Sequence, residues 1–269
     1  LALLSSFTPS QATELAPSLK TIVSFDKQHA NKFGELIVQD SSGRMKPMNT
    51  LSTEVLAKIY KGSSLAIGKH TLNANQVVLG MMVKPEAYKN IKIIKTKDER
   101  INKIIGGVAD AKYASFAQFF EDPDSIAGYK LAPYVDSAVR KEAKYRDKFD
   151  KKVLEIDEKV NVSFMVFTGQ LVKIWPKPND ANNKWFPTIE ALQTFDDADG
   201  ENVRRGAVDY FTSVDASIVS GDWSASNTAL ASIASYQKQH GASVYPSDSR
   251  IAAEVFYNEM QIFERIYPI

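Results

Sequence analysis

The chain has 269 residues, of which 44% are hydrophobic and 24% are charged, and this is enough to bury a substantial core. The 33 Lys and Arg residues against 32 Asp and Glu residues leave a net charge of +1, which excludes a bulk electrostatic field that would recruit nucleic acid or an acidic membrane. The chain contains no cysteine, which excludes disulfide bonds and thiolate catalysis.

The two ends of the chain bear on its location. No apolar run approaches the ~20 residues that a membrane span requires, and Leu1–Phe7 is too short and lacks the basic residues of a signal peptide. Because residue 1 is leucine, we expect a fragment or a processed chain. The apolar and aromatic residues 262–269 fit either a helix end that faces the core or a point just before a membrane span.

The strongest local signals lie in residues 33–59. They predict a short β-hairpin, with strands at 36–38 and 44–46, a turn in which Gly43 is free to adopt positive φ, and Pro47 as the end of the second strand. Asn49 or Thr50 is expected to cap the helix that follows. The apolar residues of this helix recur at helical spacing and are Leu51, Val55, Leu56 and Ile59.

The middle of the chain is predominantly helical by the period of its apolar residues. Asn73, with Gln76 three residues later, predicts a capping box, and residues 91–95 predict a short strand. The longest helical pattern runs from about 134 to 174, and Trp175–Pro176 is expected to end it. Its densely charged beginning, residues 140–152, is explained either by a solvated helix face, which is the default, or by a binding patch.

The C-terminal third predicts three helices, at about 202–220, 224–240 and 247–267, with Gly221 and Gly241 between them. Short connections favour antiparallel helical hairpins. The predicted fold is mainly α, with helical hairpins, one long helix, a short N-terminal β-hairpin and few strands. The expected organisation is a flexible lead (1–27), an N-terminal lobe (28–176) and a C-terminal helical lobe (188–269), separated by the Pro-rich and Asn-rich loop at 177–187; one continuous domain is the alternative.

Several blocks of sequence, in this order, resemble the large extracytoplasmic segment of system II cytochrome c biogenesis proteins of the fused CcsB–CcsA (ResB–ResC) type. The resemblance extends over most of residues 28–267. The blocks are 28–34, 33–59, 75–81, 91–94, 111–116, 148–150, 157–161, 176–180, 184–185 and 236–263. Their order along the chain carries the resemblance, because no single block is as specific as a paired metal-binding motif.

The resemblance implies that the parent protein exports reduced haem and joins it to the CxxCH cysteines of an apocytochrome, so that the parent acts as a haem lyase. This segment is then expected to lie on the periplasmic side of the bacterial inner membrane, with apocytochrome c and the membrane-embedded parts of the same protein as partners. The family's tryptophan-rich WWD segment has no match here, since Trp175, Trp185 and Trp223 stand far apart. We therefore expect a scaffold or docking domain that is not itself an enzyme and has no cofactor of its own.

Candidate site residues follow from the first resemblance blocks. Among the three histidines, His29 is the candidate haem ligand, because haem iron accepts a neutral imidazole, although an exposed or capping histidine is the more ordinary interpretation. Gln39, Asp40, Arg44 and Asn49 are the candidate partner-binding surface. For the hairpin turn, the structural alternative is an Asx-type turn closed by Asp40, with Arg44 paired back to it.

A second class of function stays open at this point. The chain is also compatible with a stand-alone periplasmic module that binds a ligand in a pocket between two helical lobes, or that serves as an interaction module. Phosphate loops, GxSxG elbows and HExxH motifs are all absent from the sequence, so a hydrolase or transferase is a distant third. Flanking hydrophobic spans in the complete gene would favour the membrane assembly protein.

Overall fold

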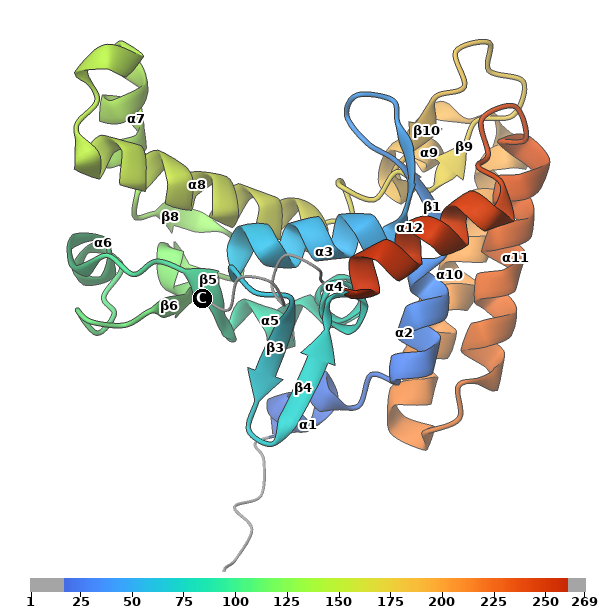
Figure 1. The fold of residues 1–269 in the computed structure, drawn as a ribbon, viewed down its shortest axis with the longest axis horizontal. Coiled ribbons are helices and arrows are strands. Elements are labelled where there is room, and N and C mark those ends of the chain that lie inside the picture. The colour runs from blue at the N-terminus through green and yellow to red at the C-terminus, as the bar shows by residue number, and fades with distance from the viewer. Residues whose placement is uncertain (1–16, 261–269) are drawn as a thin grey trace, which may run out of the picture.

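The structure, a computed structural model, describes residues 17–260. Within this range it is mainly α-helical, as predicted, with twelve α-helices and ten short strands that pair into five two-stranded antiparallel sheets (Figure 1). The α-helices are α1 Pro17–Val23, α2 Lys27–Gly34, α3 Met48–Ile59, α4 Ala74–Val83, α5 Pro85–Lys89, α6 Glu99–Ile104, α7 Ala132–Arg140, α8 Lys148–Phe167, α9 Thr188–Thr194, α10 Asp197–Ser220, α11 Ser224–His240 and α12 Asp248–Met260. The strands are β1 Ile37–Gln39, β2 Met45–Pro47, β3 Ser64–Ile67, β4 His70–Asn73, β5 Lys92–Lys95, β6 Tyr113–Ser115, β7 Phe120–Asp122, β8 Ala127–Tyr129, β9 Trp175–Pro176 and β10 Trp185–Phe186.

The hairpin predicted near the N-terminus is present as β1 and β2, and Val38 lies opposite Lys46 in its register. The prediction that Asn49 or Thr50 caps the next helix is wrong. Helix α3 already begins at Met48, and the N-cap is Pro47, whose side chain makes no cap hydrogen bond. The Met48 amide instead donates to the Leu36 carbonyl at 2.7 Å, so the hairpin itself satisfies one free amide of the first helical turn.

The predicted capping box of Asn73 and Gln76 is confirmed at the start of α4, with both reciprocal hydrogen bonds formed. The prediction of a single long helix over 134–174 is wrong. This segment contains two helices, α7 and α8, because Asp147 starts the second helix through its own capping box with Asp150. Helix α8 ends at Phe167, ahead of Gly169 at φ +70°, and Trp175–Pro176 form a strand instead of a helix end.

One hydrophobic cluster contains buried residues from nearly the whole described chain, from Ile22 in α1 to Ile233 in α11. Residues 1–16 of the expected flexible lead lie outside the described residues. Within its remainder, Ile22 and Phe25 are almost fully buried, so residues 17–27 belong to the folded body because they supply apolar side chains to the core. The cluster also joins residues from both of the lobes that the sequence suggested.

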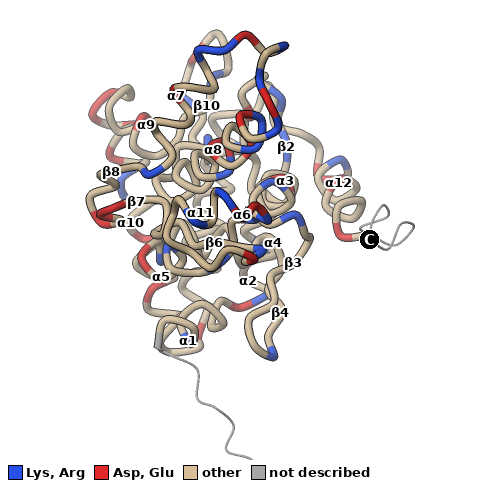
Figure 2. The backbone as a smooth tube through the Cα atoms, turned by 90° about the vertical axis from the view of Figure 1, so that its left-hand side faces the viewer, with Lys and Arg blue, Asp and Glu red and all other residues tan. Residues whose placement is uncertain are grey.

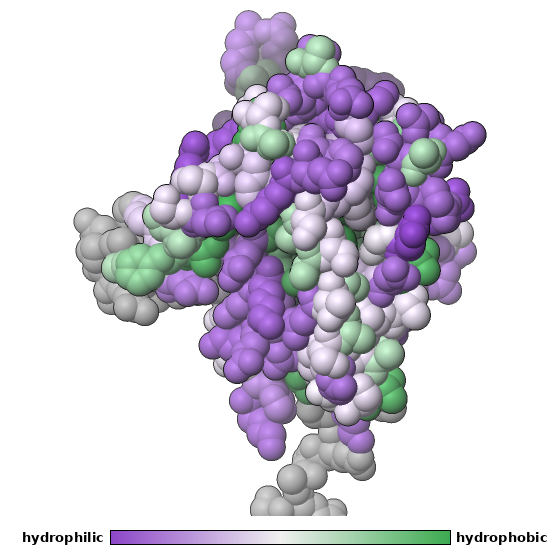
Figure 3. Space-filling view, turned by 90° about the vertical axis from the view of Figure 1, so that its right-hand side faces the viewer, coloured by the Kyte–Doolittle hydropathy of each residue, from purple (hydrophilic) through white to green (hydrophobic). Residues whose placement is uncertain are grey.

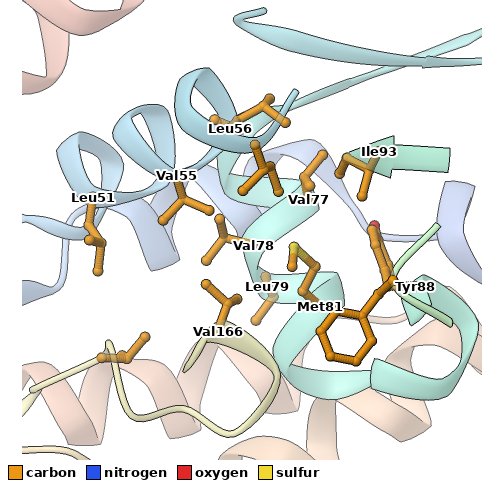
Figure 4. Close-up of a cluster of buried hydrophobic side chains, with 14 of the residues drawn as sticks. Leu51, Val55, Leu56, Val77, Val78, Leu79, Met81, Tyr88, Ile93 and Val166 are labelled. Carbon is orange, nitrogen blue, oxygen red and sulfur yellow. The ribbon is translucent and has the colours of Figure 1, made fainter. Parts of the chain in front are cut away.

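The centre of this core lies between α3 and α4 (Figure 4). Leu51, Val55 and Leu56 project from α3 toward the apolar residues of α4, with Val166 of α8 and Tyr88 of α5 nearby. Gly80 of α4 lies so close to Tyr88 that an added Cβ would overlap the tyrosine ring and hydroxyl. This small residue therefore sets how closely α5 can approach α4.

The three predicted C-terminal helices are present as α10, α11 and α12, and the end of the last prediction, residues 261–267, lies outside the described residues. Helices α10 and α11 form a hairpin at one end of the molecule, and α7 with the start of α8 lies at the opposite end (Figure 1). Gly221, at φ +77°, supplies the left-handed residue that ends α10. Across residues 17–260, every helix is too short or too polar to cross a bilayer.

Helix α12 crosses β2 and α3 and leaves a groove of about 780 Å³ between itself, α11 and the end of α2. The apolar part of the groove is lined by Leu36, Leu230, Ile251, Val255 and Phe256. Figure 3 shows the right-hand side of the molecule in Figure 1. On this face, green apolar side chains lie in a recess bordered by purple polar ones. A smaller groove of about 420 Å³ lies between the end of α8, α9 and α10.

Candidate functional site

The predicted site residues surround the β1–β2 hairpin, where elements from the two halves of the chain meet. We define the hairpin junction as His29, Gln39, Asp40, Arg44 and Asn49 together with the side chains that bind them. All but Asp40 are bonded to residues more than 140 positions away in the sequence. The junction is therefore where α10, α11, α12 and the β9–β10 hairpin attach to the N-terminal elements.

Gln39 joins two hairpins. Its Oε1 accepts from the Trp185 amide at 2.9 Å, and its Nε2 donates to the Asn183 carbonyl at 3.0 Å. The side-chain amide thus pairs with the backbone beside β10 as a neighbouring strand would. The segment 177–187, expected as a lobe boundary or long loop, contains the connection between β9 and β10 and is fixed to β1 by these bonds.

Asp40 closes the hairpin turn, as the structural alternative predicted. Its Oδ1 accepts from the Ser42 amide at 2.8 Å, the Ser42 hydroxyl at 2.7 Å and the Arg44 amide at 3.0 Å. Its partial burial alone would raise its pKa, but these hydrogen bonds and the nearby Lys46 ammonium hold the pKa of the Asp40 carboxyl below its ordinary value. Asp40 is consequently a carboxylate at neutral pH, and its charge organises the turn.

The prediction that the Arg44 side chain pairs back to Asp40 is wrong. The Arg44 guanidinium instead donates to Glu254 of α12 at 2.8 Å. The turn bonds of Asp40 go to the Arg44 backbone amide, which leaves the arginine side chain free to reach the helix that passes over the hairpin. Glu254 also accepts from the Thr50 hydroxyl at 2.8 Å, so one carboxylate of α12 binds both the β1–β2 turn and α3.

Asn49 is nearly buried and lies beneath α12. Its Oδ1 accepts from Asn258 Nδ2 at 3.0 Å, and the same Asn258 amide donates to the Thr50 hydroxyl at 2.8 Å. Asn49 therefore helps to position α12 in this structure. Its role in binding a separate partner stays a prediction, as do those of Gln39, Asp40 and Arg44, of which Arg44 has the most exposed side chain at 53%.

His29 is buried, with 1% of its surface exposed. Its Nδ1 lies 3.0 Å from Asn227 Oδ1, its Nε2 lies 3.1 Å from the Tyr210 hydroxyl, and its ring lies 4.8 Å from that of Trp223. Because Asn227 offers an acceptor, Nδ1 carries the proton of the neutral ring and Nε2 accepts from Tyr210. Burial lowers the pKa of His29 below its ordinary value, against the opposing effects of Asn227 and Asp26, so the ring is neutral at pH 7.

This arrangement does not fit haem at His29. An axial ligand needs a nitrogen lone pair facing an open space for the porphyrin, whereas here the Nε2 lone pair accepts a hydrogen bond and Trp223 and Tyr210 pack against the ring. Among the described residues, no three His, Cys, Asp or Glu side chains are grouped so that they could hold a metal ion. Haem ligation by His29 stays a prediction that this geometry does not support.

The buried polar residues beside the hairpin junction were not predicted from the sequence. The most important is Gln237 of α11, which is fully buried and bonds both to the Ile37 backbone and to the Ile174 carbonyl. A signal was available, because Gln237 continues the apolar face of Leu230 and Ile233 at helical spacing, which places a polar side chain in the core. For Glu254 and Asn258, the charged and polar surface of α12 gave no comparable signal.

No family model matches the chain. Protein NrfI of Wolinella succinogenes is 31% identical to it over 277 aligned residues. The alignment includes the whole of this chain but only 28% of the length of NrfI. The chain is therefore similar throughout to one segment of a much longer protein.

Proposed function

We propose that this chain is the extracytoplasmic domain of a cytochrome c biogenesis protein of the fused CcsB–CcsA type, on the periplasmic side of the bacterial inner membrane. In this proposal the parent protein exports haem and attaches it to apocytochrome c. This domain serves as a scaffold on which the apocytochrome and the membrane-embedded parts of the parent protein are positioned.

The observation that carries this proposal is the 31% identity with NrfI, which extends over the whole chain and supports a role in cytochrome c biogenesis. The ordered sequence blocks that resemble the system II family support the same role. NrfI is far longer than this chain, which is compatible with a domain that works as one part of a larger protein.

Hydrogen bonds made by residues of the resemblance blocks support the scaffold role. His29, Gln39 and Asn49 hold distant parts of the chain together through hydrogen bonds. A residue that fixes the internal architecture is not available to bind haem without a rearrangement. The chemistry of haem attachment is accordingly assigned to the parent protein outside this domain.

A maturation assay in cells tests the proposal. A host that lacks its own cytochrome c assembly system is given the parent gene and a reporter c-type cytochrome, and covalently bound haem is measured on the reporter. Replacing the domain by a flexible linker is expected to abolish maturation, and Gln237→Leu, which removes the hydrogen bonds from α11 to Ile37 and Ile174, is expected to reduce it strongly. Gln239→Leu, an exposed change on the same helix, is the matched control. Full maturation without the domain would overturn the proposed function.

The groove between α11, α12 and α2 favours the second class of function, a periplasmic module that binds a ligand. It has about 780 Å³, within the size range of small-molecule sites, and it is lined by residues from both of the lobes that the sequence suggested. Binding in this groove would be visible as protection of α12 from amide exchange on addition of the ligand. In the maturation assay a stand-alone module would be dispensable, which separates the two functions.

A further inference from the structure

The connection between α7 and α8 forms a basic, partly apolar tip at one end of the molecule. We define the α7–α8 tip as residues 139–151, and it lies at the opposite end from the α10–α11 hairpin (Figure 1). The tip carries six Lys or Arg residues against three Asp or Glu residues, although the chain as a whole is only +1. More blue than red marks this connection at the top of Figure 2.

Part of this positive charge is not compensated within the described chain. Lys141 pairs with Asp150 at 2.8 Å, and Lys144 pairs with Glu142 at 3.0 Å. The exposed Arg140, Lys148 and Lys151, by contrast, form no ion pair with any residue in 17–260. Lys148 and Lys151 are three residues apart in the first turn of α8, so they share one face of that helix.

Two exposed apolar side chains accompany these cations. Tyr145 is 68% exposed and Val139 is 59% exposed, and the Lys144 ammonium lies 4.8 Å from the Tyr145 ring centroid. Neither side chain contributes to the buried core of the described residues. The tip therefore presents an exposed aromatic and an exposed aliphatic group within a segment of net positive charge.

We propose that the α7–α8 tip is a contact site for an anionic phospholipid surface. Tyrosine is favoured at the membrane–water interface, and each Lys or Arg held near an anionic leaflet adds to the attraction. The lipid surface is favoured over nucleic acid because the exposed aliphatic Val139 matches the boundary between headgroups and acyl chains, whereas a base offers only stacking to Tyr145. This inference does not depend on the proposed role in cytochrome c biogenesis.

Co-sedimentation of the 269-residue chain with vesicles tests the inference. The chain is expected to bind vesicles of phosphatidylcholine mixed with phosphatidylglycerol, to bind pure phosphatidylcholine vesicles much more weakly, and to lose binding as salt is added. The triple variant Arg140→Gln, Lys148→Gln, Lys151→Gln should weaken binding on the order of 100-fold. The triple variant Lys27→Gln, Lys69→Gln, Arg250→Gln removes the same charges from exposed positions elsewhere and should bind like the unaltered chain.

Tyr145→Ser supplies an independent readout. It should weaken vesicle binding at every salt concentration without changing the salt dependence, because it removes an apolar contact and no charge. Equal binding to both kinds of vesicle, or equal losses in the two triple variants, would overturn the inference. Tighter binding to a single-stranded oligonucleotide than to anionic vesicles at the same salt concentration would also overturn it and would identify nucleic acid as the partner.

Discussion

The side chain of Gln237 takes the place of a neighbouring strand for Ile37. Its Oε1 accepts from the Ile37 amide at 3.1 Å and its Nε2 donates to the Ile37 carbonyl at 2.9 Å, on the edge of β1 that β2 does not cover. The same Nε2 donates to the Ile174 carbonyl at 2.9 Å. One fully buried amide therefore joins the N-terminal hairpin, the segment before β9 and helix α11.

Gln237→Leu is expected to lower the free energy of unfolding by about 3 kcal/mol or more. The change keeps a similar volume but leaves the Ile37 amide and two carbonyls buried without these partners, at roughly 1–3 kcal/mol for each orphaned group. Chemical denaturation measures the effect. Gln239→Leu is the control, because Gln239 is exposed on the same helix and its change should be nearly neutral. Similar midpoints for the two variants would contradict the structural role of Gln237.

The attachment of α12 is expected to depend more on Asn258 than on Arg44. Asn258→Ala removes two hydrogen bonds to nearly buried partners, Asn49 and Thr50. Arg44→Ala breaks a pair whose arginine side chain is 53% exposed, and such pairs contribute about 0–1 kcal/mol. Amide hydrogen exchange of residues 248–260 should increase more in Asn258→Ala. The reverse order would show that charge holds the helix.

His29 is expected to make stability depend on pH. In the unfolded chain it titrates near its usual pKa of 6.5, whereas burial lowers the pKa of the folded-state ring. Below about pH 6.5 the unfolded state therefore binds more protons, and the stability present at neutral pH is lost as the pH falls toward the folded-state pKa. Denaturation of the original chain and of His29→Gln at pH 7 and at pH 5 measures this. The difference in unfolding free energy between the two proteins should be smaller at pH 5, and an unchanged difference would contradict the buried neutral state.

Tyr88→Phe is expected to leave stability unchanged or to raise it by about 0.5–1.5 kcal/mol. The Tyr88 hydroxyl is buried and has no hydrogen-bond partner among the described residues, so its removal relieves a desolvation cost. Gly80→Ala acts at the same contact in the opposite direction, because its Cβ would overlap Tyr88. Thermal unfolding should therefore move upward or not at all for the first variant and downward for the second. A large loss of stability in Tyr88→Phe would indicate a hydrogen bond that this structure does not contain.

Local sequence signals predicted the elements whose determinants lie close together in the chain. The Asn73 capping box and the β1–β2 hairpin are fixed by residues within a few positions of one another. The division of α7 from α8 could also have been foreseen, because Asp147 and Asp150 carry the spacing of a cap inside a continuous apolar stripe. The periodicity of the apolar residues alone did not indicate this boundary.

The candidate site was harder to predict because its contacts are not local. The sequence indicated Arg44 and Asn49 as site residues. Their hydrogen-bond partners, Glu254 and Asn258, lie more than 200 residues further along the chain. Likewise, whether His29 is an exposed ligand or a buried core residue depends on Tyr210 and Asn227, which only the tertiary fold brings near it. The sequence therefore located the hairpin junction without showing that its residues bind one another.

A haem titration of the 269-residue chain tests most sharply whether His29 belongs to the internal architecture of a scaffold domain. Haem is added to the original chain and to His29→Gln, the Soret band is recorded, and circular dichroism confirms that both proteins are folded. If His29 is internal, the two proteins give the same spectrum, with no Soret shift that depends on His29. A tight stoichiometric complex that is formed by the original chain and lost in His29→Gln would contradict it.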